Sequence, residues 1–260
     1  MKCSELIAKL EELSPPMYAL EWDNPGLLVG GKQQEIRKVL LSVDVTDEVI
    51  DEAIAQGANM IIAHHPLIFR KLKRVVAEDL TGRRILRMVQ HSIACYCMHT
   101  NFDIMGMADE AADMLGLSSA EVLEVTYEDE LSKEGIGRYG YWKQNGTLLE
   151  LGEHVKRVFG LEHVTLYGDL QSPMVKVAIS TGSGSDMVSL AIAAGCDAII
   201  TGDIGYHCAL DAIAEGLCII DAGHFGLEKI FIPYMKTYLE REAEGIEAIP
   251  STQKEIGYHL

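Results

Sequence analysis

The stretch AIAQGANMII at residues 53–62 reappears 138 residues later as AIAAGCDAII at residues 191–200, with six of the ten positions identical. Each copy has the pattern of a helix end, a glycine suited to the left-handed backbone of a helix C-terminus, and a short apolar strand. In the first copy the helix is predicted over residues 47–56 and the strand over residues 60–63. A helix that leads into a buried strand is typical of a β-α-β unit, whose strands are parallel.

The same alternation continues around both copies. In the first half, strands are predicted over residues 39–43 and 93–98, with a helix over 82–91 between them. The N-terminus adds a helix over residues 4–13. The second half is predicted to contain strands over residues 175–179, 198–201 and 217–220, and helices over residues 185–194 and 206–215. The sequence therefore predicts an α/β fold made of two related halves that arose by internal duplication.

The middle of the chain breaks the alternation. Residues 122–170 contain glycine-rich segments and are predicted to form strands and turns, with one helix near residues 151–159. We therefore assign residues 1–121 to a first α/β half, 122–170 to a connecting strand and helix segment, and 171–260 to a second α/β half. The three parts are expected to form one structural unit.

The composition excludes several classes of protein. The chain has 260 residues, a net charge of −17 and 48% hydrophobic residues, which excludes a disordered chain. The acidic balance argues against nucleic acid as a partner, because phosphate binding needs a Lys/Arg surface. No apolar run reaches the roughly 18 residues of a membrane helix, and the N-terminus lacks a signal-peptide core. The six cysteines form no CxxC pair and lie mostly in apolar runs. These features predict reduced thiols and a cytoplasmic protein without a membrane partner.

Metal-binding side chains follow three of the predicted strands. Because ligands in open α/β sheets bind at the carboxyl ends of strands, these side chains are expected to converge. A mixture of imidazoles and carboxylates suits Zn, Fe or Mn better than Ca or Mg. More than four protein ligands indicates two ions, which can activate water for hydrolysis. The candidates are His64, His65, His99, Asp103, His224 and Glu228.

Each of these patterns also has a purely structural explanation. The adjacent pair His64 and His65 can arise by chance, as one packed and one surface residue. A histidine four residues before a carboxylate also makes an ordinary pair on a helix face. The combination is more informative, because the two His-x3-acid patterns lie 125 residues apart at matching places in the two halves.

Other polar residues at strand ends leave alternatives open. Asp44 either orients a ligating histidine or caps the following helix. The Gly/Ser loop at residues 181–185 either holds an anion or makes a tight strand-to-helix turn. Asp203 and His207 either face the same pocket, or His207 has a core or capping role. The remaining histidines are interpreted as structural or surface residues: His91, His154, His163 and His259.

Several motifs in combination resemble the NIF3-like family, also called DUF34 or GTP cyclohydrolase 1 type 2 homologs, over essentially the whole chain. The motifs are EWDNPGLLVG at 21–30, DVT at 44–46, AHHPLIF at 63–69, HTNFD at 99–103, GIGR at 135–138, TGD at 201–203 and DAGHFGLE at 221–228. The resemblance implies two similar α/β halves around a central cavity that binds two divalent metal ions. It also implies a homohexameric ring, built as a trimer of dimers. The short middle segment leaves no room for the domain inserted in some relatives.

The resemblance also assigns roles to individual residues. The implied metal ligands are His64, His65, Asp103, His224 and Glu228. His99 would lie beside the metal ions as the catalytic acid–base candidate.

Two hypotheses of function follow. The first is a metal-dependent hydrolase acting on a small molecule, such as a nucleotide. The second is a non-enzymatic metal-binding, metal-chaperone or regulatory protein. The mixed donor set slightly favours the enzyme, because such sites can keep coordination positions open.

Overall fold

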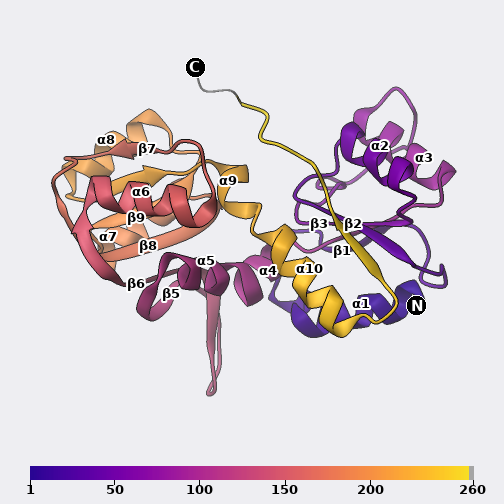
Figure 1. The fold of residues 1–260 in the computed structure, drawn as a ribbon, viewed down its shortest axis with the longest axis horizontal. Helices are drawn as coiled ribbons and strands as arrows, with labels where there is room; N and C mark the ends of the chain where they lie inside the picture. Colours follow the sequence, from indigo (N-terminus) through magenta and orange to yellow (C-terminus); the bar gives the residue numbers. More distant parts are fainter. Residues whose placement is uncertain (258–260) are drawn as a thin grey trace. The chain divides into compact units, whose positions relative to one another are not determined.

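The computed structural model describes residues 1–257 and divides into two compact units (Figure 1). Unit 1 comprises Met1–Phe102 and Phe231–Lys254, and unit 2 comprises Asp103–Ile230 with the described residues after Lys254. Each unit contains one sheet with helices packed on it, which confirms the predicted α/β class. The boundaries predicted after residues 121 and 170 both fall inside unit 2. That all parts form one structural unit stays a prediction.

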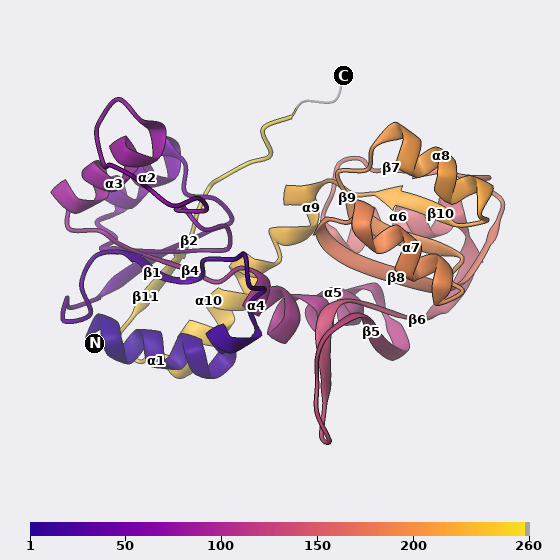
Figure 2. The same cartoon turned by 180° about the vertical axis from the view of Figure 1, so that it is seen from behind.

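The sheet of unit 1 has the strand order β1-β4-β3-β2-β11. Its strands are β1 (Gly26–Val29), β2 (Lys38–Ser42), β3 (Met60–Ala63), β4 (Ala94–Cys97) and β11 (Glu247–Pro250). All neighbours are parallel except β1, which is antiparallel to β4. Helices α2 (Asp47–Gln56) and α3 (Leu80–Gln90) cover one face, while α1 (Cys3–Leu13) and α10 (Phe231–Glu242) cover the other (Figure 2). Because both faces are covered, β3 and β4 are buried along their whole length.

Local signals explain why α2 begins and ends where the sequence predicts. The Thr46 side chain accepts a hydrogen bond from the backbone N–H of Val49 and caps the first turn. At the other end, Gly57 has φ +67°, and its N–H donates to the carbonyls of Ala53 and Ile54. The chain then enters β3 directly, so both bounds of this helix and strand agree with the prediction.

The sheet of unit 2 has the strand order β5-β6-β8-β9-β10-β7. Its strands are β5 (Leu117–Glu128), β6 (Lys133–Thr147), β7 (Thr165–Tyr167), β8 (Pro173–Ser183), β9 (Ala198–Gly202) and β10 (Cys218–Asp221). The neighbours β8, β9 and β10 are parallel, and the other pairs are antiparallel. The helices of this unit are α5 (Ala108–Leu115), α6 (Leu148–Phe159), α7 (Val188–Ala193), α8 (Tyr206–Ala214) and α9 (His224–Glu228). The hairpin of β5 and β6 extends away from the rest of unit 2 (Figures 1 and 2).

The two sheets repeat one topology. The order β1-β4-β3-β2 in unit 1 corresponds to β7-β10-β9-β8 in unit 2, with the same strand directions. This correspondence agrees with the sequence repeat, whose two copies at residues 53–62 and 191–200 extend into strands β3 and β9. It establishes likeness of fold, and the duplication itself stays a prediction.

Several elements differ from the sequence expectation. The helix predicted over residues 185–194 is shorter, because β8 continues to Ser183 and a 3-10 turn at Ser185–Met187 precedes α7. Helix α10 and strand β11 were not predicted, and they return the chain to unit 1. The segment Asp103–Met107 forms a π-helix between the short helix α4 (Thr100–Phe102) and α5.

All six cysteines are free thiols, and five of them are buried. Burial raises the pKa of the Cys196 thiol to about 11, with a smaller opposing effect from Lys176. This agrees with the prediction of structural thiols. None of the helices in residues 1–257 is long and apolar enough to cross a membrane.

Candidate metal centre

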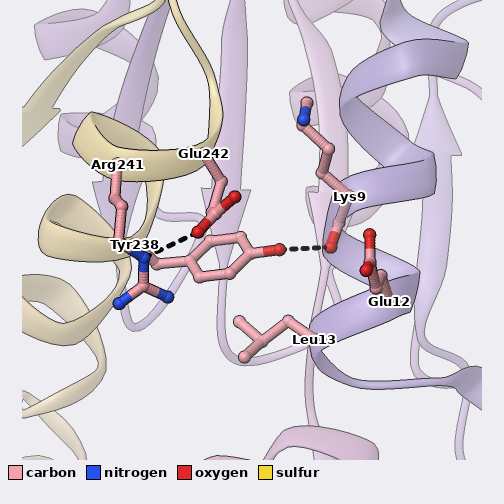
Figure 3. A pocket seen from close by; sticks show the side chains of 6 residues that line it. All are labelled: Lys9, Glu12, Leu13, Tyr238, Arg241 and Glu242. Carbon is pink, nitrogen blue, oxygen red and sulfur yellow. Dashed lines mark hydrogen bonds and ion pairs between the residues drawn. The ribbon is translucent and has the colours of Figure 1, made fainter.

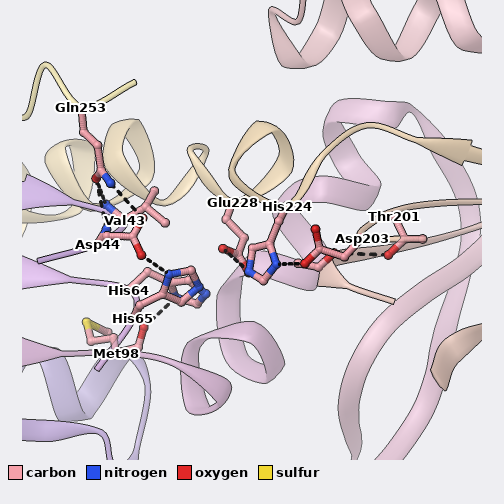
Figure 4. A network of polar contacts seen from close by, with 11 residues as sticks. Val43, Asp44, His64, His65, Met98, Thr201, Asp203, His224, Glu228 and Gln253 are labelled. Atoms are coloured by element: carbon pink, nitrogen blue, oxygen red, sulfur yellow. Dashed lines mark hydrogen bonds and ion pairs between the residues drawn. The ribbon is translucent and has the colours of Figure 1, made fainter. Parts of the chain in front are cut away.

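The first site residues follow β3 in unit 1. Beyond the strand, the N–H of His64 donates to Ser42 and that of His65 to Val43, which continues the pairing with β2. The side chain of His64 is fully buried, and its Nδ1 donates to the Met98 carbonyl at 2.8 Å (Figure 4). This bond fixes the ring and leaves Nε2 as the nitrogen with a lone pair.

His65 is held by a carboxylate. Its Nδ1 donates to Asp44 Oδ1 at 2.7 Å, and Asp44 lies just beyond Ser42, the last residue of the neighbouring strand β2 (Figure 4). The other carboxylate oxygen of Asp44 accepts from Gln253 Nε2 at 2.8 Å. Gln253 Oε1 in turn accepts from the N–H groups of Val43 and Asp44 at 3.2 and 3.1 Å. Of the two readings left open for Asp44, orientation of a histidine is therefore correct, while Thr46 caps the helix.

His99 has the same arrangement. Its Nδ1 donates to Asp23 Oδ1 at 2.8 Å, and the Asp23 side chain is fully buried. Asp23 Oδ2 accepts from the N–H and the hydroxyl of Thr100. Burial raises the pKa of this carboxyl, but the hydrogen bonds from His99 and Thr100 and the electrostatic interaction with His99 outweigh it. The net effect lowers the Asp23 pKa to about 2.

The three histidines of unit 1 form one cluster. One ring nitrogen from each of His64, His65 and His99 lies within 4.8 Å of the others. The ring centroids are 5.0 to 5.6 Å apart. Since the Nδ1–H group of each of the three rings is bonded to an oxygen, Nε2 is the nitrogen that can bind a metal ion. Histidines that bind metal usually have this second bond to a carboxylate or carbonyl.

Unit 2 contains a second group of candidate metal-binding side chains. His224 begins α9, a short loop after β10 ends at Asp221, and its Nδ1 donates to Asp203 Oδ2 at 2.7 Å (Figure 4). Its Nε2 lies 3.1 Å from Glu228 Oε2, one helical turn further on. The side chain of Glu228 is 5% exposed. A buried carboxylate beside an oriented imidazole is a typical metal-binding pair.

Gly182 provides the space for Glu228. A Cβ atom at this position would lie 2.4 Å from Glu228 Oε1 and 3.6 Å from His224 Nε2. The backbone also has φ +73°, which favours glycine. The glycine in the 181–185 loop thus allows strand β8 to approach the Glu228 carboxylate closely. A 3-10 turn at Ser185–Met187 and then helix α7 follow this loop, and the alternative of an anion-binding loop stays a prediction.

The remaining residues singled out from the sequence differ in burial and in the contacts that they make. Asp103 is partly buried and begins the π-helix of unit 2, a feature that often marks functional sites. His207 is exposed and contacts Tyr206 edge to face, and the possibility that it faces the same pocket as Asp203 stays a prediction. His154 is buried and bonds to the Leu115 carbonyl, as a structural residue. His259 lies outside the described residues.

The donor set fits a divalent metal ion. The described residues include groups of histidine and carboxylate side chains that could hold one. Imidazole nitrogens held in one tautomer, together with carboxylates, suit Zn, Fe or Mn. The ligand roles of His64, His65, Asp103, His224 and Glu228 stay predictions, as does the acid–base role of His99.

Sequence reasoning missed two residues that support the site. Asp23 lies in the quoted motif at residues 21–30, but its spacing gave no sign that it would bond to His99, 76 residues away. Gln253 is 209 residues from Asp44, in a C-terminal segment without a recognisable pattern. An alignment showing an invariant glutamine at this position would have pointed to it.

A separate small pocket lies between α1 and α10 of unit 1 (Figure 3). There the Tyr238 hydroxyl donates to the Lys9 carbonyl at 2.6 Å, and Arg241 pairs with Glu242. The pocket is lined by Lys9, Glu12, Leu13, Tyr238, Arg241 and Glu242. None of the candidate metal ligands is among them.

The network behind His65 leads to a graded prediction. Replacing Asp44 with alanine is expected to weaken divalent metal binding about 10- to 100-fold, the usual cost of losing such a partner. Gln253→Ala removes only the support of Asp44, so its effect is expected to be smaller. Competition with a chromophoric chelator measures both, with exposed Gln171→Ala as the control. The interpretation is wrong if Asp44→Ala binds metal as tightly as the unmodified protein.

The Asp23 carboxyl predicts a dependence of stability on acid pH. Its pKa is depressed in the folded state, so its contribution is present above the unfolded value of about 3.9 and is lost as pH falls toward 2. Asp23→Asn should therefore flatten the fall in the free energy of unfolding between about pH 4 and pH 2. Urea denaturation at several pH values tests this. The exposed residue Asp186 provides the control variant, Asp186→Asn, and equal slopes for Asp23→Asn and the unmodified protein would refute the prediction.

Comparisons with known proteins agree with the motif pattern. A family model described as Duf34/NIF3 (NGG1p interacting factor 3) matches residues 1–255. A Clostridium perfringens protein named "GTP cyclohydrolase 1 type 2 homolog" is 36% identical over 256 residues, covering 97% of both chains. A protein of the same name from Streptococcus pneumoniae serotype 4 is 36% identical over 270 residues, covering 100% of this chain and 99% of the relative. The crystal structure of a Bacillus cereus protein related to NIF3 matches with a TM-score of 0.92 at 26% identity, over 100% of this chain and 99% of that one.

Proposed function

Since the chain belongs to the Duf34/NIF3 family, we propose that it is a metal-dependent hydrolase acting on a nucleotide or a related small molecule. Its cofactor would be two divalent metal ions. The proposed ligands are His64, His65, Asp103, His224 and Glu228.

One observation carries this proposal. Three histidines each donate Nδ1–H to a carboxylate at 2.7 or 2.8 Å: His65 to Asp44, His99 to Asp23, and His224 to Asp203. Such pairs cost free energy to arrange on a protein surface, because the side chains lose rotamer freedom. They are useful where a ring must present Nε2 in a fixed direction.

The metal ions, the carboxylates and His99 would have different roles in this reaction. Bound divalent ions supply a Lewis acid and lower the pKa of water to near neutrality. The carboxylates of Asp44 and Asp203 keep His65 and His224 in one tautomer and orientation. Asp23 does the same for His99, so that His99 can accept and return a proton at Nε2. The names of the relatives, which refer to a GTP cyclohydrolase, support a nucleotide as the first substrate to test.

Elemental analysis and turnover test the proposal separately. Protein purified without added metal is expected to contain about two equivalents of Zn, Fe or Mn per chain. The metal-loaded protein is then assayed on GTP and other nucleotides, with and without a chelator. Less than one equivalent of metal contradicts the two-ion centre. Retained metal without metal-dependent turnover contradicts the hydrolase and leaves the metal-binding or metal-chaperone role.

We also propose a homohexamer, arranged as a trimer of dimers, and a cytoplasmic location. Light scattering would then give six times the chain mass of 28.6 kDa. A monomeric or dimeric mass at micromolar concentration would contradict the hexamer.

A further inference from the structure

Two exposed aromatic rings lie beside the histidine cluster of unit 1. Trp22 is 57% exposed and Phe69 is 53% exposed. Their ring centroids are 5.7 Å apart, and they lie 5.9 and 6.5 Å from the ring of His99. Single exposed apolar residues are common and need no explanation. Two neighbouring rings that continue directly into a group of imidazoles are a more specific arrangement.

Hydrogen bonds of the neighbouring residues hold the two loops that carry these rings. Next to Trp22, the Asp23 carboxylate is bonded to His99 and Thr100. The following residue, Asn24, donates from Nδ2 to the carbonyl of Ile68 at 2.6 Å. This bond ties the loop that carries Trp22 to the loop that carries Phe69. A ligand that stacks on these rings would therefore find them already positioned, at little entropic cost.

The segment directly after Phe69 is positively charged, although the protein as a whole is negatively charged. The protein carries 39 acidic and 22 basic residues, yet four of the five residues from Arg70 to Arg74 are basic. All five are exposed. Arg74 pairs with Asp79 at 3.3 Å, at an exposed position where solvent screens the pair. A basic segment in a chain with a net charge of −17 indicates a local preference for anions.

We propose that Trp22 and Phe69 form a stacking platform for the base of a nucleoside phosphate, whose phosphate groups are bound by the basic residues at 70–74. The aromatic rings recognise the planar base, because stacking requires only a π-face. The lysine and arginine side chains recognise the phosphates. The proposal deepens the proposed function by naming how that substrate class binds, but binding can be measured without turnover.

Tryptophan fluorescence gives a direct readout. The sequence has two tryptophans, and Trp142 is only 2% exposed. Added GTP is therefore expected to quench Trp22 selectively, while ribose 5-phosphate, which has no base, leaves the fluorescence unchanged. Equal quenching by ribose 5-phosphate, or none by GTP, overturns the stacking platform.

Calorimetric titration with GTP tests the two parts of the platform. Trp22→Ala is expected to weaken binding about 10-fold or more, and Trp22→Phe to restore most of it. The double variant Lys71→Glu with Lys73→Glu is expected to weaken GTP binding and to reduce its dependence on salt. The control is Tyr206→Ala, which removes an aromatic ring that is 72% exposed in unit 2.

The outcomes separate this proposal from the hydrolase proposal. GTP binding that depends on Trp22 without any turnover supports the platform and contradicts the hydrolase. Turnover of GTP with an unchanged KM in Trp22→Ala supports the hydrolase and overturns the platform. If Trp22→Ala lowers the mass seen by light scattering and leaves the Kd for GTP unchanged, the rings belong to a contact between copies of the chain, and the platform is overturned.

Discussion

His65→Ala is expected to lower the affinity for divalent metal more than 100-fold, and with it any metal-dependent activity. The loss of a partner that only orients a ligand costs up to about 100-fold, so the loss of a ligand itself should cost more. The substitution also leaves the Asp44 carboxylate without the imidazole that it accepts from at 2.7 Å. Because His65 is only partly buried, the fold itself should tolerate the change.

Matched variants separate a metal ligand from a surface histidine. His207→Ala removes an exposed imidazole in unit 2 and is expected to bind metal as the unmodified protein does. Glu228→Ala tests the carboxylate group in the same way, with exposed Glu215→Ala as its control. Metal content is measured by elemental analysis after dialysis, and affinity by chelator competition. If His65→Ala retains the full metal content with unchanged affinity, His65 is not a ligand.

Gly182→Ala is expected to damage the Glu228 site without removing any polar atom. The new Cβ would lie 2.4 Å from Glu228 Oε1, which no real contact allows, so the carboxylate or strand β8 must move. The left-handed backbone at φ +73° adds about 1–2 kcal/mol of strain for a residue with a Cβ. We therefore expect lower stability together with metal affinity as low as that of Glu228→Ala.

Gly195→Ala is the matched control for this prediction. Gly195 has φ +68° in the same unit, and its Cβ would have no atom within 4 Å. It therefore suffers a similar backbone strain, at the end of α7 and away from Glu228. Urea denaturation is expected to give similar losses for the two variants from this strain, with any excess in Gly182→Ala due to the clash. Chelator competition is expected to separate them clearly. Equal metal affinity in both variants would mean that Gly182 has no role at the Glu228 carboxylate.

The sequence was a good guide where the signals are local. The bounds of α2 and β3 were predicted correctly, because an apolar stripe and Gly57 mark them within a few residues. The candidate metal ligands were chosen from sequence because side chains at the carboxyl ends of parallel strands meet at one edge of the sheet, and their ligand roles stay predictions. Asp44 was recognised as a possible partner of a histidine for the same reason, and its bond to His65 confirms that reading.

The sequence was a poor guide to helix α10 and strand β11. Strand β11 has only four residues, with both ends exposed and two half-buried residues between them. It is defined by pairing with β2, more than 200 positions earlier in the chain. Such a strand is stabilised by its partner and not by its own propensity, so a single sequence contains little sign of it.

The α/β class, the repeated helix and strand, and the residue types available for metal binding could therefore be inferred from the sequence. The bonds between Gln253 and Asp44 and between Asp23 and His99, and the space that Gly182 leaves for Glu228, became visible only in the folded chain. The difference lies in how far apart in the sequence the interacting residues are. Caps and periodicities act within one or two helical turns, whereas the direction of a ligating side chain depends on bonds to residues far away in the chain.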